Sequence, residues 1–411
     1  METLKFLMIS THFPPHHLGG DAVFVEYLSK ELVRRGHEVH VFHNPAIYKL
    51  LRSANPAIPR TEGELDAIRH QYSSSIGKYE PIMALTLGRW GRAVSKLTEL
   101  ERELNPDVIH WHNTRGFIGK PFPFPGRVSL HTSHDYMPVC PRSNLLKPGM
   151  NLCKDPKWCT VCCMRWGRPP QLWRTGRRRV LRFDDELRVI SPSEFLANRL
   201  KSEGIPVHKV LPLFVPDISG NLPVTPHERD TLVYIGLLDK HKGVDVLLNA
   251  FCKSSTKQGF KLWIIGEGPM KQRLALKAEQ SGVKERVIIP GYLERMEAEK
   301  IRMNAAAQIV PSVWYENAPL TVMEALSLGV PIIGSNIGGL PEMIGPETGS
   351  EIFEPGDEAR LSELIISLWN QRSTLEERCR RARRTYELRF TPEIHLAEYI
   401  RLVKALGGQG R

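Results

Sequence analysis

Two glutamates, Glu316 and Glu324, lie eight positions apart with Pro319 between them. An apolar run that predicts a buried strand ends before this segment, and an apolar helical pattern follows it. Proline suits the first turn of a helix because its missing N–H has no intrahelical partner there. The N–H groups of Leu320 and Thr321 would then lack an acceptor at the positive end of the helix dipole. The segment therefore predicts a site for a diphosphate.

The residues beside this helix start predict which kind of ligand contains the diphosphate. Asn317 or Ala318 is expected in the N-cap region of the helix. Glu324, one turn into the helix, can accept hydrogen bonds from two neighbouring hydroxyls, as on a ribose. Glu316, still in the loop, reaches past the phosphates toward a sugar. The predicted ligand is a nucleoside-diphosphate sugar. The alternative is that both glutamates are surface charges of a helix.

Strand and helix patterns alternate along almost the whole chain of 411 residues and form two successive β–α series. Nearly continuous apolar strands that alternate with helices predict two parallel sheets covered by helices, an α/β fold with two Rossmann-like domains. A segment rich in Pro, Gly and Asn separates the two series. The predicted boundaries are an N-terminal, acceptor-side domain at 1–215, a linker at 216–229, a nucleotide-sugar-binding domain at 230–390 and a helix at 391–411 that packs back toward the first domain.

The Glu-x7-Glu spacing, the proline at the helix start and the following element Gly329–Ile333 resemble one family of enzymes. These are the retaining glycosyltransferases of the GT-B fold, glycosyltransferase family 4, also called glycosyl transferases group 1. The resemblance covers nearly the whole chain. It implies two Rossmann-like domains whose sheets face each other across a deep cleft, transfer of a hexose-type sugar with retention of configuration, and no metal in catalysis. Glu316 would then be catalytic.

The resemblance extends to glycine-rich loops that follow predicted strands. Gly19–Gly20 matches the loop that approaches the donor phosphate and the acceptor, where a Cβ would block the approach. Gly236 begins the loop that supplies an arginine and a lysine to the diphosphate in the family. Lys242 matches that lysine, but Leu237 occupies the position of the arginine. Stabilisation of the leaving group would therefore depend on Lys242, on Lys240 and on the helix start.

Three further segments resemble parts of the family's donor site. Gly266–Glu267–Gly268 looks like the tight turn beneath the nucleotide, and the segment at Tyr292 looks like the one whose backbone reads the edge of the base. Gly338–Gly339 resembles a later loop near the sugar. Together with the helix start, these segments place the donor in the second domain.

Histidines at strand ends of the first domain are the remaining candidates. His134 occupies the family's histidine position and would contact the donor sugar as a catalytic residue, with Asp135 orienting it. His110 and His112 flank a tryptophan at another strand end and could line the acceptor side. A lone histidine at a strand end is often structural, so that alternative stays open for each.

Five of the seven cysteines fall between Cys140 and Cys163, in a segment (138–170) that lacks periodicity and reads as an insertion. In a chain without a secretion signal, such clustering favours a structural metal over disulfides. Zinc takes four thiolates, and an iron–sulfur cluster, a disulfide or free thiols are the alternatives. The predicted zinc ligands are Cys140, Cys153, Cys159 and Cys162.

The net charge of +11 would attract phosphorylated substrates or an anionic membrane surface. Nucleic acid is not expected, because aromatic and basic residues are not interleaved as in proteins that stack bases. Candidate membrane contacts are Trp166–Arg168 and the basic run 174–179, although short basic runs, such as 378–384, are usually solvated helix faces. No apolar run is long enough to span a bilayer. The expected location is the cytoplasm, with peripheral attachment at the inner membrane face.

Two other functions fit the same residues. One is a nucleotide-sugar epimerase of the same fold, and the other is a non-catalytic protein that binds nucleotide sugars. The proline at the helix start and the Lys242–Gly243 loop favour a transferase over an epimerase. Leu237, in the place of the family arginine, is the residue that raises the non-catalytic alternative. The sequence specifies neither the sugar, the base nor the acceptor.

Overall fold

A computed structural model describes residues 3–16, 19–54, 69–71, 79–88, 91–154, 158–175, 180–221 and 229–408. Its described residues divide into two compact units. The first contains the chain up to Leu213 together with the C-terminal segment from Pro392, and the second contains Phe214–Thr391. Half of the predicted linker (222–228) and the end of the basic run (176–179) lie outside the described residues.

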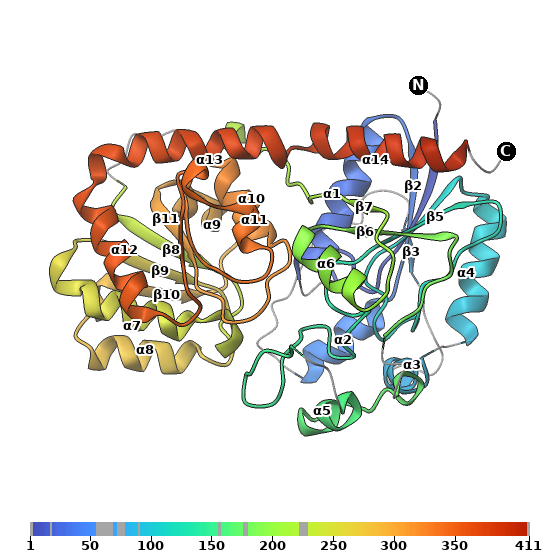
Figure 1. Cartoon of the computed structure of the whole chain (residues 1–411), viewed down its shortest axis with the longest axis horizontal. Helices are drawn as coiled ribbons and strands as arrows, with labels where there is room; N and C mark the ends of the chain where they lie inside the picture. Colours follow the sequence, from blue (N-terminus) through green and yellow to red (C-terminus); the bar gives the residue numbers. More distant parts are fainter. Residues whose placement is uncertain are drawn as a thin grey trace. The chain divides into compact units, whose positions relative to one another are not determined.

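The first unit is a seven-stranded parallel sheet with helices packed around it (Figure 1). The strand order is β3-β2-β1-β4-β5-β6-β7. The elements in chain order are β1 Lys5–Ile9, α1 Gly20–Arg34, β2 Glu38–His43, α2 Pro45–Ala54, β3 Arg69–Gln71, α3 Glu80–Leu87, α4 Gly91–Leu104, β4 Val108–Trp111, β5 Val128–Thr132, α5 Cys159–Arg165, β6 Leu187–Ser191, α6 Glu194–Ser202, β7 Lys209–Val210 and α14 Pro392–Gly407.

The second unit is a six-stranded parallel sheet of order β10-β9-β8-β11-β12-β13. The predicted α/β class with two parallel sheets is confirmed. Its elements are β8 Thr231–Ile235, α7 Val244–Ser254, β9 Lys261–Ile265, α8 Lys271–Gln280, β10 Val287–Gly291, α9 Arg295–Met303, β11 Ala305–Val310, α10 Leu320–Ser327, β12 Ile332–Ser335, α11 Leu340–Met343, β13 Glu351–Phe353, α12 Glu358–Asn370 and α13 Leu375–Arg389.

Local sequence signals explain where several helices begin and end. Ser193 caps α6 by accepting a hydrogen bond from the N–H of Leu196 at 3.2 Å. Gly36 follows α1 in the left-handed conformation at φ +85°, which glycine adopts readily. Its N–H donates to the carbonyl of Val33, and the N–H of His37 donates to that of Leu32. This arrangement satisfies the last carbonyls of the helix.

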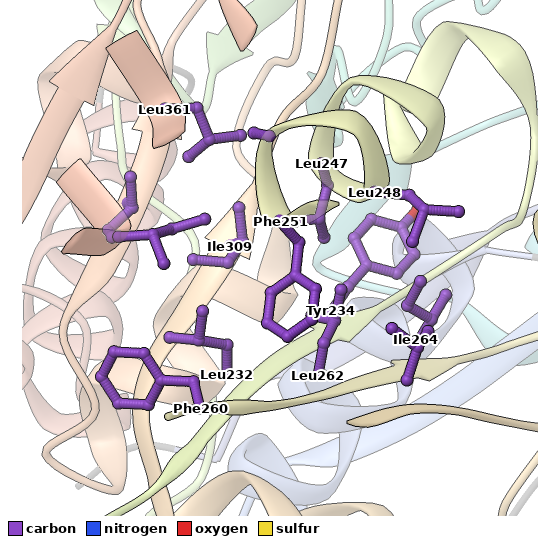
Figure 2. Close-up of a cluster of buried hydrophobic side chains, with 14 of the residues drawn as sticks. Leu232, Tyr234, Leu247, Leu248, Phe251, Phe260, Leu262, Ile264, Ile309 and Leu361 are labelled. Atoms are coloured by element: carbon purple, nitrogen blue, oxygen red, sulfur yellow. The ribbon is translucent and has the colours of Figure 1, made fainter. Parts of the chain in front are cut away.

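A buried apolar cluster fixes the second sheet against its helices (Figure 2). Strand residues such as Leu232 and Leu262 meet Phe251 of α7 and Leu361 of α12, and all four are inaccessible to solvent. Burying each such side chain stabilises the fold by about 1.5–3 kcal/mol. The carboxyl ends of these strands are thereby held rigidly, and in a parallel sheet that edge is where ligands bind.

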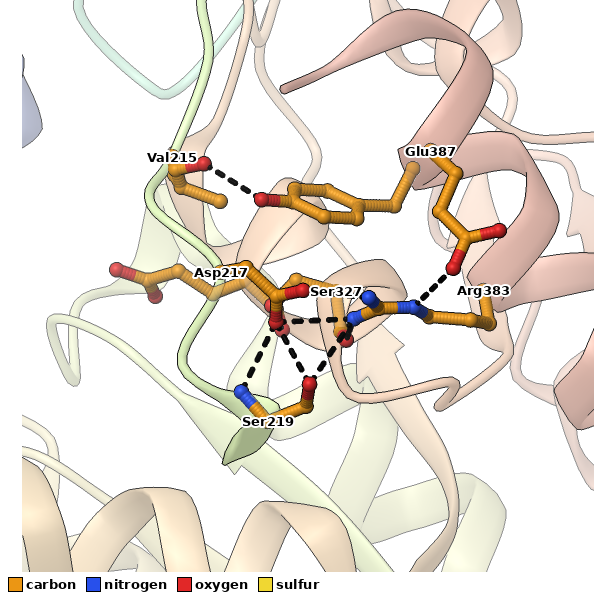
Figure 3. A network of polar contacts seen from close by, with 8 residues as sticks. Val215, Asp217, Ser219, Ser327, Arg383 and Glu387 are labelled. Carbon is orange, nitrogen blue, oxygen red and sulfur yellow. Dashed lines mark hydrogen bonds and ion pairs between the residues drawn. The ribbon is translucent and has the colours of Figure 1, made fainter. Parts of the chain in front are cut away.

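Helix α13 is fixed to the segment that enters the second unit by Arg383 (Figure 3). Its guanidinium pairs with Asp217 at 2.5 Å, reaches the hydroxyl of Ser219 at 3.3 Å, and donates to the carbonyl of Ser327. Glu387, one turn along α13, accepts from Arg383 Nε at 2.7 Å. The hydrogen bond from Arg383 lowers the pKa of Asp217 to about 2. The network joins α13, α10 and residues 217–219.

Candidate functional site

Glycine-rich loops leave the carboxyl ends of β8, β9 and β10 and pack backbone against backbone. The N–H of Gly236 donates to the carbonyl of Ile265 at 3.0 Å, and the N–H of Gly266 donates to that of Gly291 at 2.8 Å. Gly266 has a φ of +141°, and a Cβ there would lie 1.9 Å from the carbonyl oxygen of Gly236. A side chain at this position would push the loops apart. The predicted donor-binding loops at 236 and 266–268 therefore form one continuous surface.

Lys242 and Glu316, predicted from separate motifs, meet at this edge of the sheet. Lys242 Nζ lies 2.7 Å from Glu316 Oε1, which also accepts from Ser312 Oγ at 2.6 Å and from Trp314 Nε1 at 2.8 Å. Burial raises the pKa of the Glu316 carboxyl, but the charge of Lys242 and the three hydrogen bonds outweigh it, so the pKa is lowered. A buried, ionised carboxylate beside a lysine is thus in place.

The helix start predicted near Pro319 is present, with one correction. Pro319, rather than Asn317 or Ala318, is the N-cap of α10, with φ −66° and ψ 119°. The fixed φ of proline fits this extended cap, so the helix begins one residue later than a proline in the first turn would require. The carbonyl of Pro319 accepts from the N–H of Val322 at 3.1 Å. The amides of Leu320 and Thr321 are in the first turn, where no intrahelical acceptor is available.

Glu324 is held by Arg302, a residue outside every motif recognised in the sequence. Arg302 Nη2 lies 3.1 Å from Glu324 Oε2 and 3.2 Å from Thr321 Oγ1. Arg302 Nη1 binds both carboxylate oxygens of Glu299, at 2.6 and 2.7 Å. The side chain of Arg302 is only 1% exposed, whereas that of Glu324 is 17% exposed. The buried guanidinium therefore orients one carboxylate that remains within reach of solvent.

Glu267 and Tyr292 contact each other beside the same loops. Glu267 Oε1 accepts from the backbone N–H of Tyr292 at 3.1 Å and from Lys271 Nζ at 2.8 Å. The N–H of Tyr292, expected to read the base, is thus bonded to Glu267. A base could use it only after displacing that carboxylate. Gly268 packs against the carbonyl of Leu238, where a Cβ would lie at 2.4 Å.

The Gly338–Gly339 loop lies against the backbone of Glu316. The N–H of Gly339 donates to the carbonyl of Glu316 at 2.8 Å. Gly338 has a φ of +64°, and a Cβ there would lie 2.1 Å from the same carbonyl oxygen. Glycine at 338 is therefore required for Glu316 to keep its position.

In the first unit, the histidines pack together in the interior. His110 is 1% exposed, and its ring nitrogens bond Tyr399 Oη at 2.9 Å and Thr132 Oγ1 at 2.8 Å. Both nitrogens are satisfied within the unit, so His110 joins β4 to α14 and is not free to contact an acceptor. His112 Nδ1 lies 2.9 Å from His134 Nε2. Among the described residues, the buried Nε2 of His112 has no hydrogen-bond partner.

Asp135 does not orient His134 as expected. Its carboxylate accepts from the N–H of Met137 at 2.7 Å, and burial raises its pKa to about 6. The carboxylate that acts electrostatically on His134 is that of Asp21, although burial dominates and lowers the pKa of His134 to about 4. Asp21 follows Gly19, the N-cap of α1, and Gly20, its first residue. The Gly19–Gly20 loop and His134 thus belong to one neighbourhood in the first unit.

The cysteines of the insertion line one cavity of about 220 Å³. Cys140, Cys153, Cys162, Cys163, Cys252 and Cys379 are free thiols. Within the ranges that the structure describes, no three Cys, His, Asp or Glu side chains already stand close enough to hold a metal ion. Cys163, which the predicted ligand set omits, lines the cavity with the other four.

Comparisons with known proteins identify the families that the two units resemble. A family model described as Glycosyltransferase Family 4 matches residues 18–215, and one described as Glycosyl transferases group 1 matches residues 223–386. Glycogen synthase of Mycobacterium tuberculosis is 26% identical over 402 residues, which cover 92% of this chain and 89% of that protein.

Solved structures share the whole fold. Sucrose-phosphate synthase from Thermosynechococcus elongatus matches with a TM-score of 0.69 at 18% identity, over 99% of this chain and 100% of that one. HepE from Anabaena, in complex with UDP and glucose, matches with a TM-score of 0.63 at 14% identity, over 99% of this chain and 98% of that one. These likenesses confirm the GT-B fold that the resemblance in sequence predicts.

Proposed function

Because the chain belongs to the glycosyltransferases of family 4 and group 1, we propose that it is a retaining, metal-independent hexosyltransferase. Its donor is a nucleoside-diphosphate sugar, and its acceptor is a glycan or a lipid-linked glycan. The observation that carries this proposal is the meeting of Lys242, Glu316 and the start of α10 at the carboxyl edge of one sheet. A cation and a helix N-terminus together favour a diphosphate.

The proposed reaction depends on stabilising the leaving group. The bond between the anomeric carbon and the diphosphate oxygen breaks, and the anomeric carbon bonds to the acceptor hydroxyl on the same face. Negative charge then accumulates on the diphosphate, where Lys242 and the amides of Leu320 and Thr321 stabilise it. The leaving diphosphate takes the proton of the acceptor hydroxyl. Glu316 binds the sugar hydroxyls and Glu324 binds the ribose.

The known proteins support a nucleoside-diphosphate sugar as the donor, but they do not narrow the class of acceptor. HepE was solved with UDP and glucose, and the mycobacterial relative is a glycogen synthase. Both names are consistent with a hexose donor and a glycan acceptor. His112 and His134 remain proposed contributions of the first unit to sugar or acceptor binding.

Peripheral attachment to an anionic membrane at the cytoplasmic face is part of the proposal, with α5 as the contacting element. Trp166, the aromatic residue expected there, instead stacks on Arg142, whose guanidinium carbon lies 3.8 Å from the ring centroid. Trp158 and Met164 are 81% and 52% exposed on the same helix region and are the better candidates. Among the described residues, no helix has the length and apolar character needed to cross a bilayer.

The site assignment is tested by Lys242→Ala and Glu316→Ala. Each is expected to lower kcat on the order of a hundredfold or more, because each removes a charged contact used in the transition state. Lys253→Ala is the matched control: Lys253 also pairs with a glutamate, Glu358, at 2.7 Å, but from the outer face of α7. Full transfer activity in both site variants, with intact folding, would contradict the assignment.

The donor and the reaction class are tested in sequence. Thermal melts with UDP-, GDP- and ADP-sugars identify the donor, because a ligand of the folded state raises the melting temperature. Incubating the protein with that donor alone then separates a transferase from an epimerase, since only an epimerase converts the donor without an acceptor. A donor that stabilises the fold but is never turned over, with any acceptor, would indicate the non-catalytic alternative.

A further inference from the structure

A cavity in the first unit brings together cysteines that are far apart in the sequence. Cys140 follows the loop after β5, Cys153 follows a small hairpin closed by the Leu146–Leu152 bridge, and the others lie on α5. Cys140, Cys153 and Cys163 are buried. All five thiols of this region line the same cavity: Cys140, Cys153, Cys159, Cys162 and Cys163.

The charged residues that line this cavity are all cationic. They are Arg142, Lys147 and Arg165, and no aspartate or glutamate is among the lining residues described. Arg142 is 6% exposed. It donates to the carbonyl of Leu146 at 3.1 Å and forms a hydrogen bond with the Cys162 thiol. Its buried Nε has no hydrogen-bond partner within the described part of the chain.

A buried guanidinium needs a negative partner, because removing a lone charge from water is strongly unfavourable. Within the described part of the chain, the electrostatic neighbours of Arg142 are thiols, namely Cys140, Cys162 and Cys163. Neutral thiols supply no charge, whereas four thiolates around a divalent ion or an iron–sulfur cluster carry net negative charge. Such a centre would balance the cations of the cavity.

We propose that this cavity holds a structural metal centre bound by thiolates, with Cys140, Cys153 and the cysteines of α5 as its ligands. Cys159 and Cys162 are three residues apart on α5 and therefore share a face of the helix. The thiols line the cavity rather than converging on one point, so binding draws their side chains inward by rotation about Cα–Cβ. Each ligating thiol releases its proton to solvent on binding. Zinc and iron–sulfur clusters both suit thiolate ligands.

Elemental analysis of the full chain, purified without oxygen or chelators, tests this proposal. About one zinc per chain, or iron with an equivalent amount of acid-labile sulfide, is expected, and the two results identify the centre. Cys140→Ser and Cys153→Ser should each lose most of the metal. Cys252→Ser and Cys379→Ser are matched controls, since these thiols lie in the second unit, and they should keep it.

The wild-type protein alone can overturn the proposal, even if a cavity variant fails to fold. A preparation without metal, in which all seven thiols react after denaturation, would exclude a metal centre. A preparation without metal in which fewer than seven thiols react would instead indicate a disulfide. With metal present, a strong chelator should lower the melting temperature; an unchanged melting temperature after metal removal would show that the ion is not structural.

Discussion

The ion pair between Lys242 and Glu316 sets the charge of the candidate donor site before a ligand binds. Both groups are charged, and Lys242 Nζ also lies 4.8 Å above the ring of Trp314. In the proposed function, a diphosphate would take over as the partner of Lys242, and Glu316 would be released toward the sugar. The pair therefore keeps two functional charges satisfied in a site that is mostly buried.

Arg302 is predicted to act as a positioning residue for Glu324. Arg302→Met should lower the preference for a ribonucleotide donor over its 2′-deoxy analogue by about tenfold, because the loss of one charged hydrogen bond costs about 1.5 kcal/mol. The ratio of kcat/KM for the two donors measures this. Arg302→Lys should restore part of the preference.

Arg360, whose pairing with Glu363 is exposed on α12, provides the control for this experiment. Arg360→Met should leave the ratio unchanged. If Arg302→Met reduces activity with both donors equally, Arg302 supports only the fold.

Replacing Leu237 with arginine is predicted to raise the activity. Its side chain is 50% exposed, and its carbonyl accepts from Tyr234 Oη at 2.8 Å. Leu237→Arg changes only the exposed side chain, so the loop should keep its conformation. The added cation is expected to raise kcat/KM for the donor by about tenfold, equivalent to about 1.4 kcal/mol. Unchanged steady-state kinetics would show that residue 237 does not face the diphosphate.

Spacing in the sequence predicted that Glu316 and Glu324 belong to one site, and the resemblance to the family added Lys242, which lies 2.7 Å from Glu316 in the structure. The spacing of residues could not predict a role for Arg302, because the partners of Arg302, Glu324 and Thr321, come from another helix. Nor could it show that Tyr399, far along the chain, occupies one nitrogen of His110. Such contacts depend on tertiary packing, for which a single sequence carries no local signal.

At the scale of elements, the basic run on α13 is explained by ion pairs. Arg380 and Arg381 both contact Glu377 on the same helix, and Arg378 pairs with Glu351 of β13 at 3.0 Å. These contacts match the expectation of a solvated helix face. Arg383 differs because it contacts three residues outside the helix, namely Asp217, Ser219 and Ser327.

Arg383→Met is predicted to destabilise the protein by about 1–3 kcal/mol, since it removes charged hydrogen bonds that are only partly exposed. Urea unfolding measures the change in the free energy of unfolding. Arg384→Met, on the same helix and without a described ion pair, should change it by less than about 0.5 kcal/mol. Equal effects of the two substitutions would show that the network in Figure 3 contributes little.

Strands were the elements most accessible from the sequence. The apolar β pattern predicts strands at 38–43, 108–111, 231–235 and 261–265, and these ranges match β2, β4, β8 and β9. Runs of this kind mark strands that are buried on both faces. The strand expected at 208–213 is only Lys209–Val210. This strand lies at the edge of its sheet and pairs only with β6. The apolar pattern of the sequence continues past Val210, where the paired residues end.

At the scale of the whole molecule, buried histidines predict sensitivity to acid. Burial lowers the pKa of His131 to about 3 and that of His395 to about 4. Burial also lowers the pKa of His134 to about 4, and it lowers the pKa of His110 and that of His112 well below the usual value. A histidine with a lowered pKa in the folded state favours unfolding once its unfolded form binds protons, below about pH 6.5.

Stability should therefore fall between about pH 6.5 and pH 4. Asp135, with a raised pKa of about 6, and Glu299, whose pKa burial also raises, oppose this trend because the folded state binds their protons first. They are two groups against the five histidines. Thermal melts across this range measure the effect. A melting temperature that is constant or rises as the pH falls from about 7 to about 5 would contradict the prediction.

The most direct test of the account is a crystal structure of the protein with UDP, or with the nucleoside diphosphate that the melts select. We expect the phosphates to accept from the amides of Leu320 and Thr321 and from Lys242 Nζ, with the ribose hydroxyls on Glu324. A nucleotide bound elsewhere, with the pair of Lys242 and Glu316 intact, would contradict the account.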